Sequence, residues 1–290
     1  MDGWTVPVGL DEDDGRPVWD PARGTPLLPG HLAWQRLGVG ERRETWMCWS
    51  VGLWDAVVVK LVRPEARRPE ATRALHREAR ALRRTASPLL PRLLTDGRRS
   101  PVPHLVMEFM NGPALDEVLD DDGPLAASRV ADLGAGLLAA LRHLHAQGLA
   151  HLDVCPDNAV LVDGRPRLID LGASRPLGSV LARGEELGSD GFIAPELGTW
   201  EGGPVTAAMD TYALGATLQV LLDPDTDATG AVSELLALMT DPDPERRPSV
   251  ESAMAALVRH GGRRDARAWP AWADRQLEPP PRRARRRAAG

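Results

Sequence analysis

Apolar residues between Trp34 and Val62 fall into short, strand-like stretches. The stretches are LAWQRLGVG, ETWMCWSV and AVVVKLV, and the turn-prone pieces GERR and GLWD separate them. Short runs rich in β-branched and aromatic residues, bounded by turns, are typical of strands. The pattern therefore predicts three antiparallel strands.

A helical period follows in PEATRALHREARALRRT, residues 69–85. Leu75, Glu78 and Leu82 fall on one face of this predicted helix, because they are spaced by three and then four positions. The stretches LPRLLTDG and PHLVMEFM then predict two more strands. Up to about residue 110 we therefore expect a five-stranded sheet and one helix.

Helical periods dominate the second half of the chain. The clearest is SRVADLGAGLLAALRHLHAQG, in which a stripe of leucines ends before Gly148, a residue type that commonly stops helices. NAVLVDG and PRLIDLG predict a small β-hairpin, and an irregular loop over residues 173–193 follows, a length that usually indicates function. Further helices are expected at residues 115–121, 209–222, 231–239 and 249–260, the last with Ser249 as its N-cap.

The two ends of the chain differ in composition from its body. Residues 1–30 are rich in Pro, Gly and Asp without a clear period, so we expect an extension that is partly ordered at best. Its Trp4 and Trp19 could dock on the body. Residues 261–290 carry nine Arg against three acidic side chains, and we expect a basic, disordered tail. The expected divisions are residues 1–30, 31–110, 111–260 and 261–290.

The net charge of −6 argues against nucleic-acid binding by the chain as a whole. The basic tail is either a solvated end or an electrostatic contact with nucleic acid or anionic lipid. Cys48 and Cys155 form no disulfide or metal pattern and suit a reducing compartment. Without a signal-peptide pattern or a long apolar run, we expect a soluble cytoplasmic protein.

Lys60 is the one lysine in the chain, beside 34 arginines. It could be an ordinary surface lysine on a strand. However, arginine serves about equally well at solvated positions, so this chain has little reason to use lysine at such a place. A site that needs a compact ammonium rather than a planar guanidinium gives a reason. Lys60 is therefore a candidate for binding phosphate beside a buried carboxylate.

Several motifs extend this hypothesis by their order. The glycine-bearing LGVGERRET precedes Lys60, a carboxylate follows on the predicted helix, and HLDVCPDN, IDLG and APE come later. In this order the chain resembles the protein-kinase superfamily, most closely the bacterial eukaryotic-like Ser/Thr kinases, over about residues 32–260. The resemblance implies a two-lobed α+β fold, with a small five-stranded antiparallel sheet plus one helix and a larger, mainly helical lobe.

The resemblance also implies roles for the matching residues. Lys60 would contact the α- and β-phosphates of ATP and pair with Glu78. A carboxylate on the face of Leu75 and Leu82 needs such a cationic partner, and the alternative for Glu78 is a rim glutamate paired with Arg. Asp153 would orient the acceptor hydroxyl and accept its proton. Asn158 and Asp170 would bind Mg²⁺. The remaining ATP contacts would come from Leu37, Gly38, Gly40, Thr45, Val58, Met107, Glu108, Met110 and Val160.

Further matches imply scaffold roles. Ser189 would touch Asp153, and Glu196 would pair with Arg247. Asp210 would anchor the backbone of the catalytic loop, where His151 would be a buried structural residue.

The chain departs from the family pattern at four places. Arg43 stands at the third glycine position, where it could reach phosphates or clash with them. Leu152 replaces the arginine that usually pairs with a phosphorylated activation loop, so we infer that this phosphorylation is not the main switch. Cys155 replaces the lysine that usually steadies the γ-phosphate. Residues 223–230 are short where relatives usually carry a helix that helps dock protein substrates.

The sequence thus predicts a kinase that transfers the γ-phosphoryl of MgATP to Ser/Thr hydroxyls of protein substrates. One alternative is a pseudokinase that binds a nucleotide or a partner and regulates without turnover, which the departures favour. A second is a small-molecule phosphotransferase with a kinase-like fold. The short segment 223–230 favours this second alternative, and the APE region opposes it.

Overall fold

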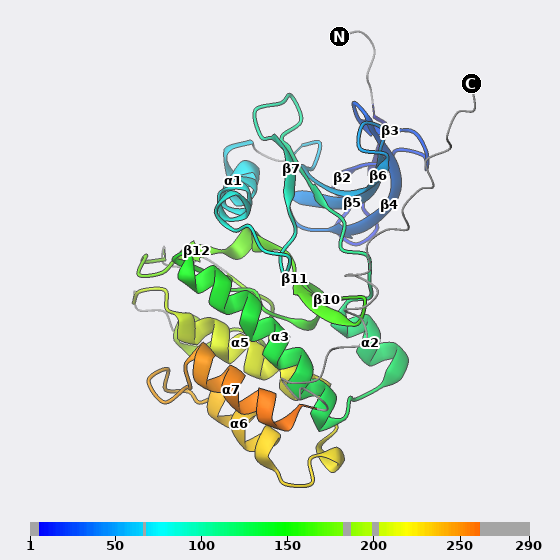
Figure 1. Ribbon diagram of the computed structural model, residues 1–290. Helices are drawn as coiled ribbons and strands as arrows, with labels where there is room; N and C mark the ends of the chain where they lie inside the picture. The colour runs from blue at the N-terminus through cyan, green and yellow to red at the C-terminus, as the bar shows by residue number, and fades with distance from the viewer. Residues whose placement is uncertain (1–5, 66–67, 182–186, 199–202, 262–290) are drawn as a thin grey trace, which may run out of the picture.

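The computed structural model describes residues 6–65, 68–181, 187–198 and 203–261, which form a strand-rich part and a helical part (Figure 1). We call residues 6–108 the strand-rich part and residues 115–261 the helical part. The fold is mixed α/β, with a curled antiparallel sheet in the strand-rich part. The predicted basic tail and Trp4 lie outside the described residues.

The main sheet has six strands in the order β3-β4-β5-β6-β8-β7, and each neighbouring pair is antiparallel. The sequence predicts five of them. The sixth, β3, comes from the residues assigned to the N-terminal extension, so the prediction of five strands is wrong. The strands are β3 (Pro26–Leu28), β4 (His31–Val39), β5 (Arg43–Ser50), β6 (Asp55–Val62), β7 (Leu93–Gly97) and β8 (His104–Glu108).

β3 is part of the core in spite of its length. Leu27 is fully buried and Leu28 nearly so, in one cluster with Trp46 and Val57. Burying a leucine side chain contributes roughly 1.5–3 kcal/mol. Three residues are too few to show an alternating pattern, which is why this strand escapes detection in the sequence.

The N-terminal segment, residues 6–30, is ordered and packs on the sheet, which corrects the expectation of a partly ordered extension. β1 (Val8–Leu10) pairs antiparallel with β2 (Pro17–Trp19). Trp19 docks as expected: its backbone N–H donates to Glu44 Oε1 at 2.9 Å, and its indole Nε1 donates to the Val62 carbonyl at 2.8 Å. The segment is therefore held by polar contacts as well as by the leucines of β3.

The buried guanidinium of Arg63 joins the N-terminal segment to the turn between β4 and β5. It donates to both carboxylate oxygens of Asp14, at 2.8 and 2.9 Å. It also donates to the carbonyls of Pro17, at 3.1 Å, and of Gly40, at 3.2 Å. The hydrogen bonds from Arg63 hold the pKa of Asp14 near 2. One side chain therefore connects the N-terminal segment to the glycine-bearing turn.

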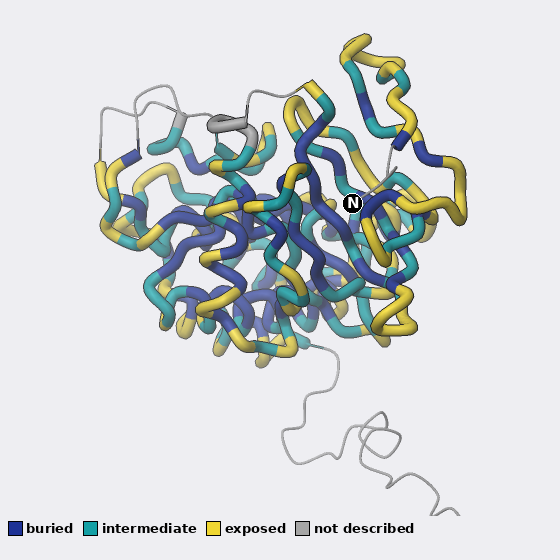
Figure 2. The backbone as a smooth tube through the Cα atoms, turned by 90° about the horizontal axis from the view of Figure 1, so that it is seen from above, coloured by how far each residue is buried: buried dark blue, intermediate teal, exposed yellow. Residues whose placement is uncertain are grey.

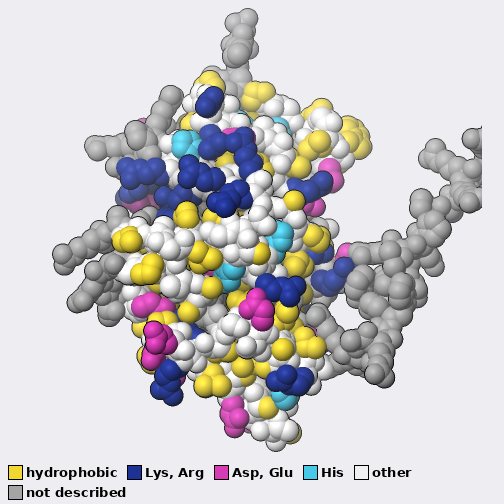
Figure 3. Space-filling view, turned by 60° about the vertical axis from the view of Figure 1, so that its left-hand side comes forward, with side chains coloured by type: hydrophobic (Ala, Val, Ile, Leu, Met, Phe, Trp, Pro, Cys, Tyr) yellow, Lys and Arg dark blue, Asp and Glu magenta, His cyan; other side chains and the backbone are white. Residues whose placement is uncertain are grey.

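α1 (Arg68–Arg84) is the helix of the strand-rich part. Leu75 and Leu82 lie on its buried face, as predicted, while Arg73, Arg80 and Arg83 are exposed. Lys and Arg side chains gather in the upper part of the molecule in Figure 3, on the side that carries α1 in Figure 1. The outer face of this helix is thus basic.

The helical part packs α3 against α5 and α7. A Cβ on Gly134 of α3 would lie 2.6 Å from side-chain carbons of Leu218 and Leu257, so glycine is what lets these helices approach closely. Ser249 accepts a hydrogen bond from Ser252 N and caps α7, as predicted. The helices are α2 (Leu115–Asp122), α3 (Ala127–Ala146), α4 (Pro195–Gly198), α5 (Ala207–Leu221), α6 (Ala231–Met239) and α7 (Val250–His260).

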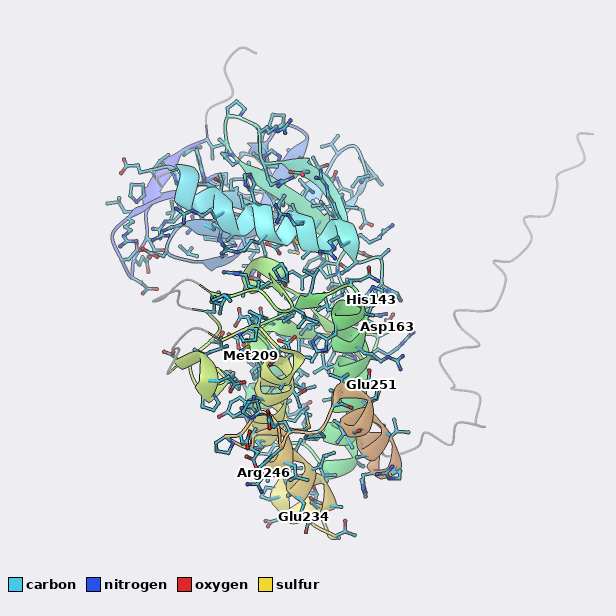
Figure 4. The ribbon with its side chains drawn as sticks, turned by 90° about the vertical axis from the view of Figure 1, so that its left-hand side faces the viewer. His143, Asp163, Met209, Glu234, Arg246 and Glu251 are labelled. Atoms are coloured by element: carbon cyan, nitrogen blue, oxygen red, sulfur yellow. The ribbon has the colours of Figure 1, made fainter. Side chains whose placement is uncertain are left out.

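Figure 4 locates these helices through labelled side chains, with His143 on α3, Met209 on α5 and Glu251 on α7. Buried chain runs through the centre of the molecule in Figure 2, with exposed residues at the turns. Among the described residues, no helix has both the length and the apolar character needed to cross a membrane.

Two-stranded sheets complete the helical part. The predicted hairpin forms from β10 (Ala159–Val162) and β11 (Arg165–Leu168). The loop predicted over residues 173–193 contains β12 (Arg175–Pro176), which pairs with β9 (Leu149–Ala150). Residues 182–186 of that loop lie outside the described residues.

The short segment 223–230 joins α5 to α6 through one 3₁₀ turn, η3 (Pro224–Thr226). Thr226 Oγ1 accepts a hydrogen bond from Ala127 N at 2.8 Å, at the start of α3. Asp227 accepts from Ser233 N at 2.7 Å, in the first turn of α6. The segment therefore caps two helices with its own side chains.

Replacing Arg63 with Met should weaken the attachment of the N-terminal segment. The variant keeps the length of the side chain but leaves Asp14 and the carbonyls of Pro17 and Gly40 without their donor. We expect the melting temperature to fall by about 5 °C. Limited proteolysis should also cut residues 6–30 faster in the variant.

Arg92→Met is the matched control, because the Arg92 side chain is 72% exposed and its ion pair with Glu108 lies on the surface. Its melting temperature should stay within about 1 °C of the parent value. Equal shifts in the two variants would contradict a special role for Arg63.

Candidate active site

A pocket of about 440 Å³ lies between the sheet and the helical part. It collects eleven of the predicted ATP- and metal-binding residues, from segments more than a hundred residues apart in sequence. They are Leu37, Gly38, Thr45, Val58, Lys60, Met107, Glu108, Met110, Asn158, Val160 and Asp170. Of the other predicted site residues, Gly40, Glu78 and Asp153 are not among those that line it.

Sequence reasoning missed several residues of the pocket wall. Met47 could have been found, because it stands two positions after Thr45 on a strand and so shares its face. Gln35 could have been found in the same way, because it stands two positions before Leu37 on β4. The others have no comparable signal in a single sequence. They are Pro91, Phe109, Gly112, Ala114, Glu117, Asp157 and Ile169.

Lys60 forms the centre of an ion cluster in this pocket. Its Nζ lies 2.7 Å from Glu78 Oε1 and 2.9 Å from Asp170 Oδ1. Burial alone would lower the pKa of Lys60, but the two carboxylates outweigh burial and raise it. For Asp170 the directions are reversed. Burial alone would raise its pKa, but the positive charges of Lys60 and Arg43 hold that pKa below its usual value. The structure therefore favours an ammonium at Lys60 and a carboxylate at Asp170.

Glu78 reaches Lys60 because it lies on the buried face of α1, as its spacing from Leu75 and Leu82 predicts. It is fully buried, and burial raises its pKa while Lys60 opposes that rise. An unpaired carboxylate would be costly here. The pair with Lys60 therefore ties the position of the helix to that of β6.

The catalytic-loop motif HLDVCPDN is held by one buried carboxylate. Asp210 accepts hydrogen bonds from the backbone N–H groups of His151 and Leu152, both at 2.8 Å. His145 Nε2 lies 2.7 Å from the same carboxylate. Burial would raise the pKa of Asp210, but the bond with His145 leads the contacts that lower it. Asp210 thus anchors this backbone, as expected.

Asp153 projects from this loop and has two fixed neighbours. Ser189 Oγ donates to Asp153 Oδ1 at 2.8 Å, as expected. Asn158 Nδ2 donates to the Asp153 carbonyl at 2.9 Å, which leaves the amide oxygen of Asn158 available as a ligand. His151 lies beneath, fully buried, with Nε2 3.0 Å from the Ile169 carbonyl. These contacts fix the carboxylate and the loop that carries it.

The donors of Asn158 and Asp170 fit a magnesium ion. Both residues line the pocket, and Ile169 N donates to the Asn158 carbonyl at 2.9 Å, so the two segments run side by side. Mg²⁺ typically takes one or two protein oxygens and fills its other positions with water and phosphate oxygens. A carboxylate and an amide oxygen match that preference.

Leu152 occupies an apolar cluster rather than a charged one. It is 4% exposed and clusters with Leu181 and Ala194, which follow the DLG turn (Asp170–Gly172), and with Val205 and Met209, which lie just before and in α5. Its φ of 67° lies in the left-handed region that favours glycine, so the surrounding packing must hold it there. Apolar contacts therefore fasten this segment where the family usually places an arginine.

Cys155 is a buried, neutral thiol in this structure. Burial raises its pKa to about 11, and its Sγ lies 3.5 Å from Ser189 Oγ. A thiol with such a pKa is protonated at neutral pH and a poor nucleophile. It supplies no positive charge at this position.

Glu196 and Arg247 form the expected pair. Two parallel hydrogen bonds of 2.7 Å join the guanidinium of Arg247 to both oxygens of Glu196. Arg247 also donates to the Ala208 carbonyl at 3.0 Å and lies over the ring of Tyr212. This bidentate pair ties α4 to α5 and to the segment before α7.

The fold and this arrangement of residues define the class of the protein. The model of the protein kinase domain matches residues 33–226. The chain therefore belongs to the protein kinase family, as its motifs predict.

Bacterial Ser/Thr kinases are among its curated relatives. The chain is 31% identical over 250 residues to the probable serine/threonine-protein kinase PkwA of Thermomonospora curvata, covering 80% of this chain and 32% of that protein. It is 28% identical over 230 residues to the serine/threonine-protein kinase AfsK of Streptomyces coelicolor (76% and 28%). It is 31% identical over 238 residues to the serine/threonine-protein kinase PknK of Mycobacterium bovis (77% and 21%). The chain spans about a third or less of the length of these relatives.

Leu152→Ala should loosen the segment that packs on it. Removing a buried leucine side chain costs about 2–5 kcal/mol. We expect a lower melting temperature and faster proteolysis between residues 187 and 198. Leu238→Ala, on the exposed surface of α6, is the same chemical change and should alter neither. Unchanged proteolysis in the Leu152 variant would contradict the fastening role.

Native protein at pH 8 should resist alkylation by iodoacetamide at both cysteines. Burial raises the pKa of Cys48 to about 12 and that of Cys155 to about 11, so little thiolate is present and both side chains are covered. Mass spectrometry should find two labels after unfolding in guanidinium and close to none before it. Rapid labelling of Cys155 in the native protein would contradict the buried, neutral thiol.

Proposed function

We propose that this chain is a Ser/Thr protein kinase that transfers the γ-phosphoryl group of MgATP to hydroxyl groups of protein substrates. One observation carries the proposal. Lys60 and Asp170 line the pocket and pair with each other beside Glu78, and Asn158 of the same pocket donates to the carbonyl of Asp153, whose carboxylate accepts a hydroxyl hydrogen bond from Ser189. Phosphate binding and hydroxyl orientation are thus combined in one cleft.

The proposed roles follow from the charges of these groups. The Lys60 ammonium, kept in place by Glu78, would bind the α- and β-phosphates. Asn158 and Asp170 would hold Mg²⁺, which when bound neutralises phosphate charge. Asp153 would orient the acceptor hydroxyl and take its proton. Catalysis of this kind depends chiefly on positioning and electrostatic stabilisation.

The adenine end of the pocket is apolar. Leu37, Val58 and Val160 would pack on the two faces of the base, and Met107 would close the back. The backbone after β8 lines the same end at Glu108 and Met110, and its amide and carbonyl groups would bind the edge of the base. Such a wall, apolar with a few fixed polar groups, is typical of small-molecule sites.

The comparisons favour neither of the two alternative functions. The named relatives are Ser/Thr kinases, which supports catalysis over a pseudokinase and protein substrates over small molecules. We further propose that residues 31–110 and 111–260 act as the two lobes of the kinase. We also propose a cytoplasmic location, because both cysteines are free thiols.

The basic tail is proposed to contact nucleic acid or anionic lipid.

The packing of Leu152 indicates how the segment that carries Ser189 is held in position. Since apolar packing fastens the segment that carries Ser189, we propose that the kinase is competent without phosphorylation of that segment.

Incubation of the purified chain with labelled ATP and Mg²⁺ tests the function. We expect phosphoryl transfer to the chain itself or to a generic protein substrate. Asp153→Asn removes the proton acceptor and should lower the rate by about a hundredfold or more. Lys60→Arg keeps the charge but misplaces it, and should lower the rate by about tenfold or more.

Binding measurements separate this function from a pseudokinase. Both variants should still be stabilised thermally by a non-hydrolysable ATP analogue with Mg²⁺, since neither removes the pocket. Nucleotide binding without any transfer, and without a difference between the parent and Asp153→Asn, would rule out the catalytic proposal.

A further inference from the structure

Arg43 faces the pocket side of the sheet. It begins β5, in which residues alternate between the two faces. Glu44 and Trp46 are buried on one face. Thr45 and Met47, on the other, line the pocket. Arg43 belongs to this second set, so its side chain leaves the strand toward the cleft.

The strand register places Arg43 beyond Lys60 on the path away from adenine. β6 pairs Val58 with Met107 at the adenine end. Thr45 pairs with Lys60, and two positions further along Arg43 pairs with Val62. Two strand residues correspond to roughly 7 Å. Arg43 therefore lies on the far side of Lys60 from the base, where the last phosphate of a triphosphate would extend.

The end of the Arg43 side chain lies over the DLG turn. A Cβ on Gly172 would be 3.1 Å from Arg43 Nη1, so the glycine leaves the space that the guanidinium occupies. The positive charge of Arg43 also contributes, after Lys60, to the lowered pKa of Asp170. The guanidinium is thus next to one of the two proposed metal ligands.

Among the described residues, the Arg43 guanidinium makes no hydrogen bond and no ion pair within 4 Å. This distinguishes it from Lys60, which is engaged by Glu78 and Asp170. Its neighbour Arg42 is different as well, because that side chain pairs with Glu41. Arg43 therefore places beside Asp170 a guanidinium that no described carboxylate of the protein contacts directly.

Among the described residues of the opposite wall, Cys155 occupies the position where the family pattern has a lysine. It is buried and neutral, with its sulfur facing Ser189. The negative charge of a triphosphate and the nearby Asp153 and Asp170 must nevertheless be balanced at this end of the cleft. A guanidinium suits this task, since it remains charged and can donate two parallel hydrogen bonds to one phosphate.

We propose that Arg43 binds the terminal phosphate of the nucleotide and supplies, from the turn between β4 and β5, the positive charge that position 155 does not provide. The inference rests on the proposed function, because it assigns a further residue to the same site. It gives a reason for an arginine where the family pattern has a glycine.

Equilibrium binding with Mg²⁺ tests the assignment, with AMP-PNP as the triphosphate and ADP as the diphosphate. Arg43→Met removes the charge and keeps the length of the stem. We expect it to weaken AMP-PNP binding by about tenfold or more and ADP binding by less than about threefold. Arg43→Lys should give an intermediate loss. Arg42→Met, which removes the same charge one residue away, should change neither affinity.

A second variant tests the complementarity of the two positions. Adding Cys155→Lys to Arg43→Met returns a cation to the opposite wall, and we expect it to recover part of the preference for AMP-PNP over ADP. A melting temperature for each variant separates loss of fold from loss of binding. If the double variant does not fold, the comparison of AMP-PNP with ADP in Arg43→Met decides alone.

The outcomes distinguish a failure of the role of Arg43 from a failure of the proposed kinase function. Parent protein that binds neither nucleotide would overturn both. Parent protein that binds both, with AMP-PNP affinity unchanged in Arg43→Met, would overturn the role of Arg43 alone. Equal losses for the two nucleotides would indicate a structural role instead, and tighter binding by Arg43→Met would show that the arginine obstructs the cleft. Each of these two results also rejects the inference.

Discussion

The meeting of three charges at one point constrains the rest of this structure. Lys60 of β6 and Glu78 of α1 are buried and would be costly to bury alone, and Asp170 joins them from the pocket wall with its side chain 33% exposed. A buried ion pair is weak evidence for stability, because desolvation offsets much of the attraction. The cluster instead fixes the relative positions of β6, α1 and the DLG turn, because the Lys60 ammonium is compensated only when all three are in place. Arg77 reinforces this meeting point from α1 by donating to the Gly172 carbonyl at 3.2 Å.

Two segments of the site are held by different physical forces. The turn between β4 and β5 is linked to the N-terminal segment by the hydrogen bonds of Arg63, which are polar and directional. The segment that carries Ser189 is held instead by the apolar cluster around Leu152. Apolar packing has no dependence on a modifying group, whereas a charged residue at this place would need an anion to balance it. The arrangement therefore suits a domain whose cleft is assembled when it folds.

The elements and site residues that could be predicted from the sequence are those whose pattern is set by neighbouring positions in the chain. Glu78 was predictable because helical spacing alone places it on the face of Leu75 and Leu82. The main strands and helices were predictable for the same reason. β3 was not, since its three residues show no period and its place is set by burial against distant side chains. Arg63 gave no signal either, because its partner Asp14 lies 49 positions away and a single sequence does not pair such charges.

The close approach of α7 to α3 has a consequence for where this chain can be divided. The family match ends at residue 226, yet Leu257 packs at Gly134. At the other end the match begins at residue 33, after the buried leucines of β3. A polypeptide trimmed to the matched span would open an apolar surface at each end, and such surfaces promote association. For recombination or gene fusion, a boundary drawn from family similarity alone would therefore cut through the core, because β3 and α7 both lie outside the matched span.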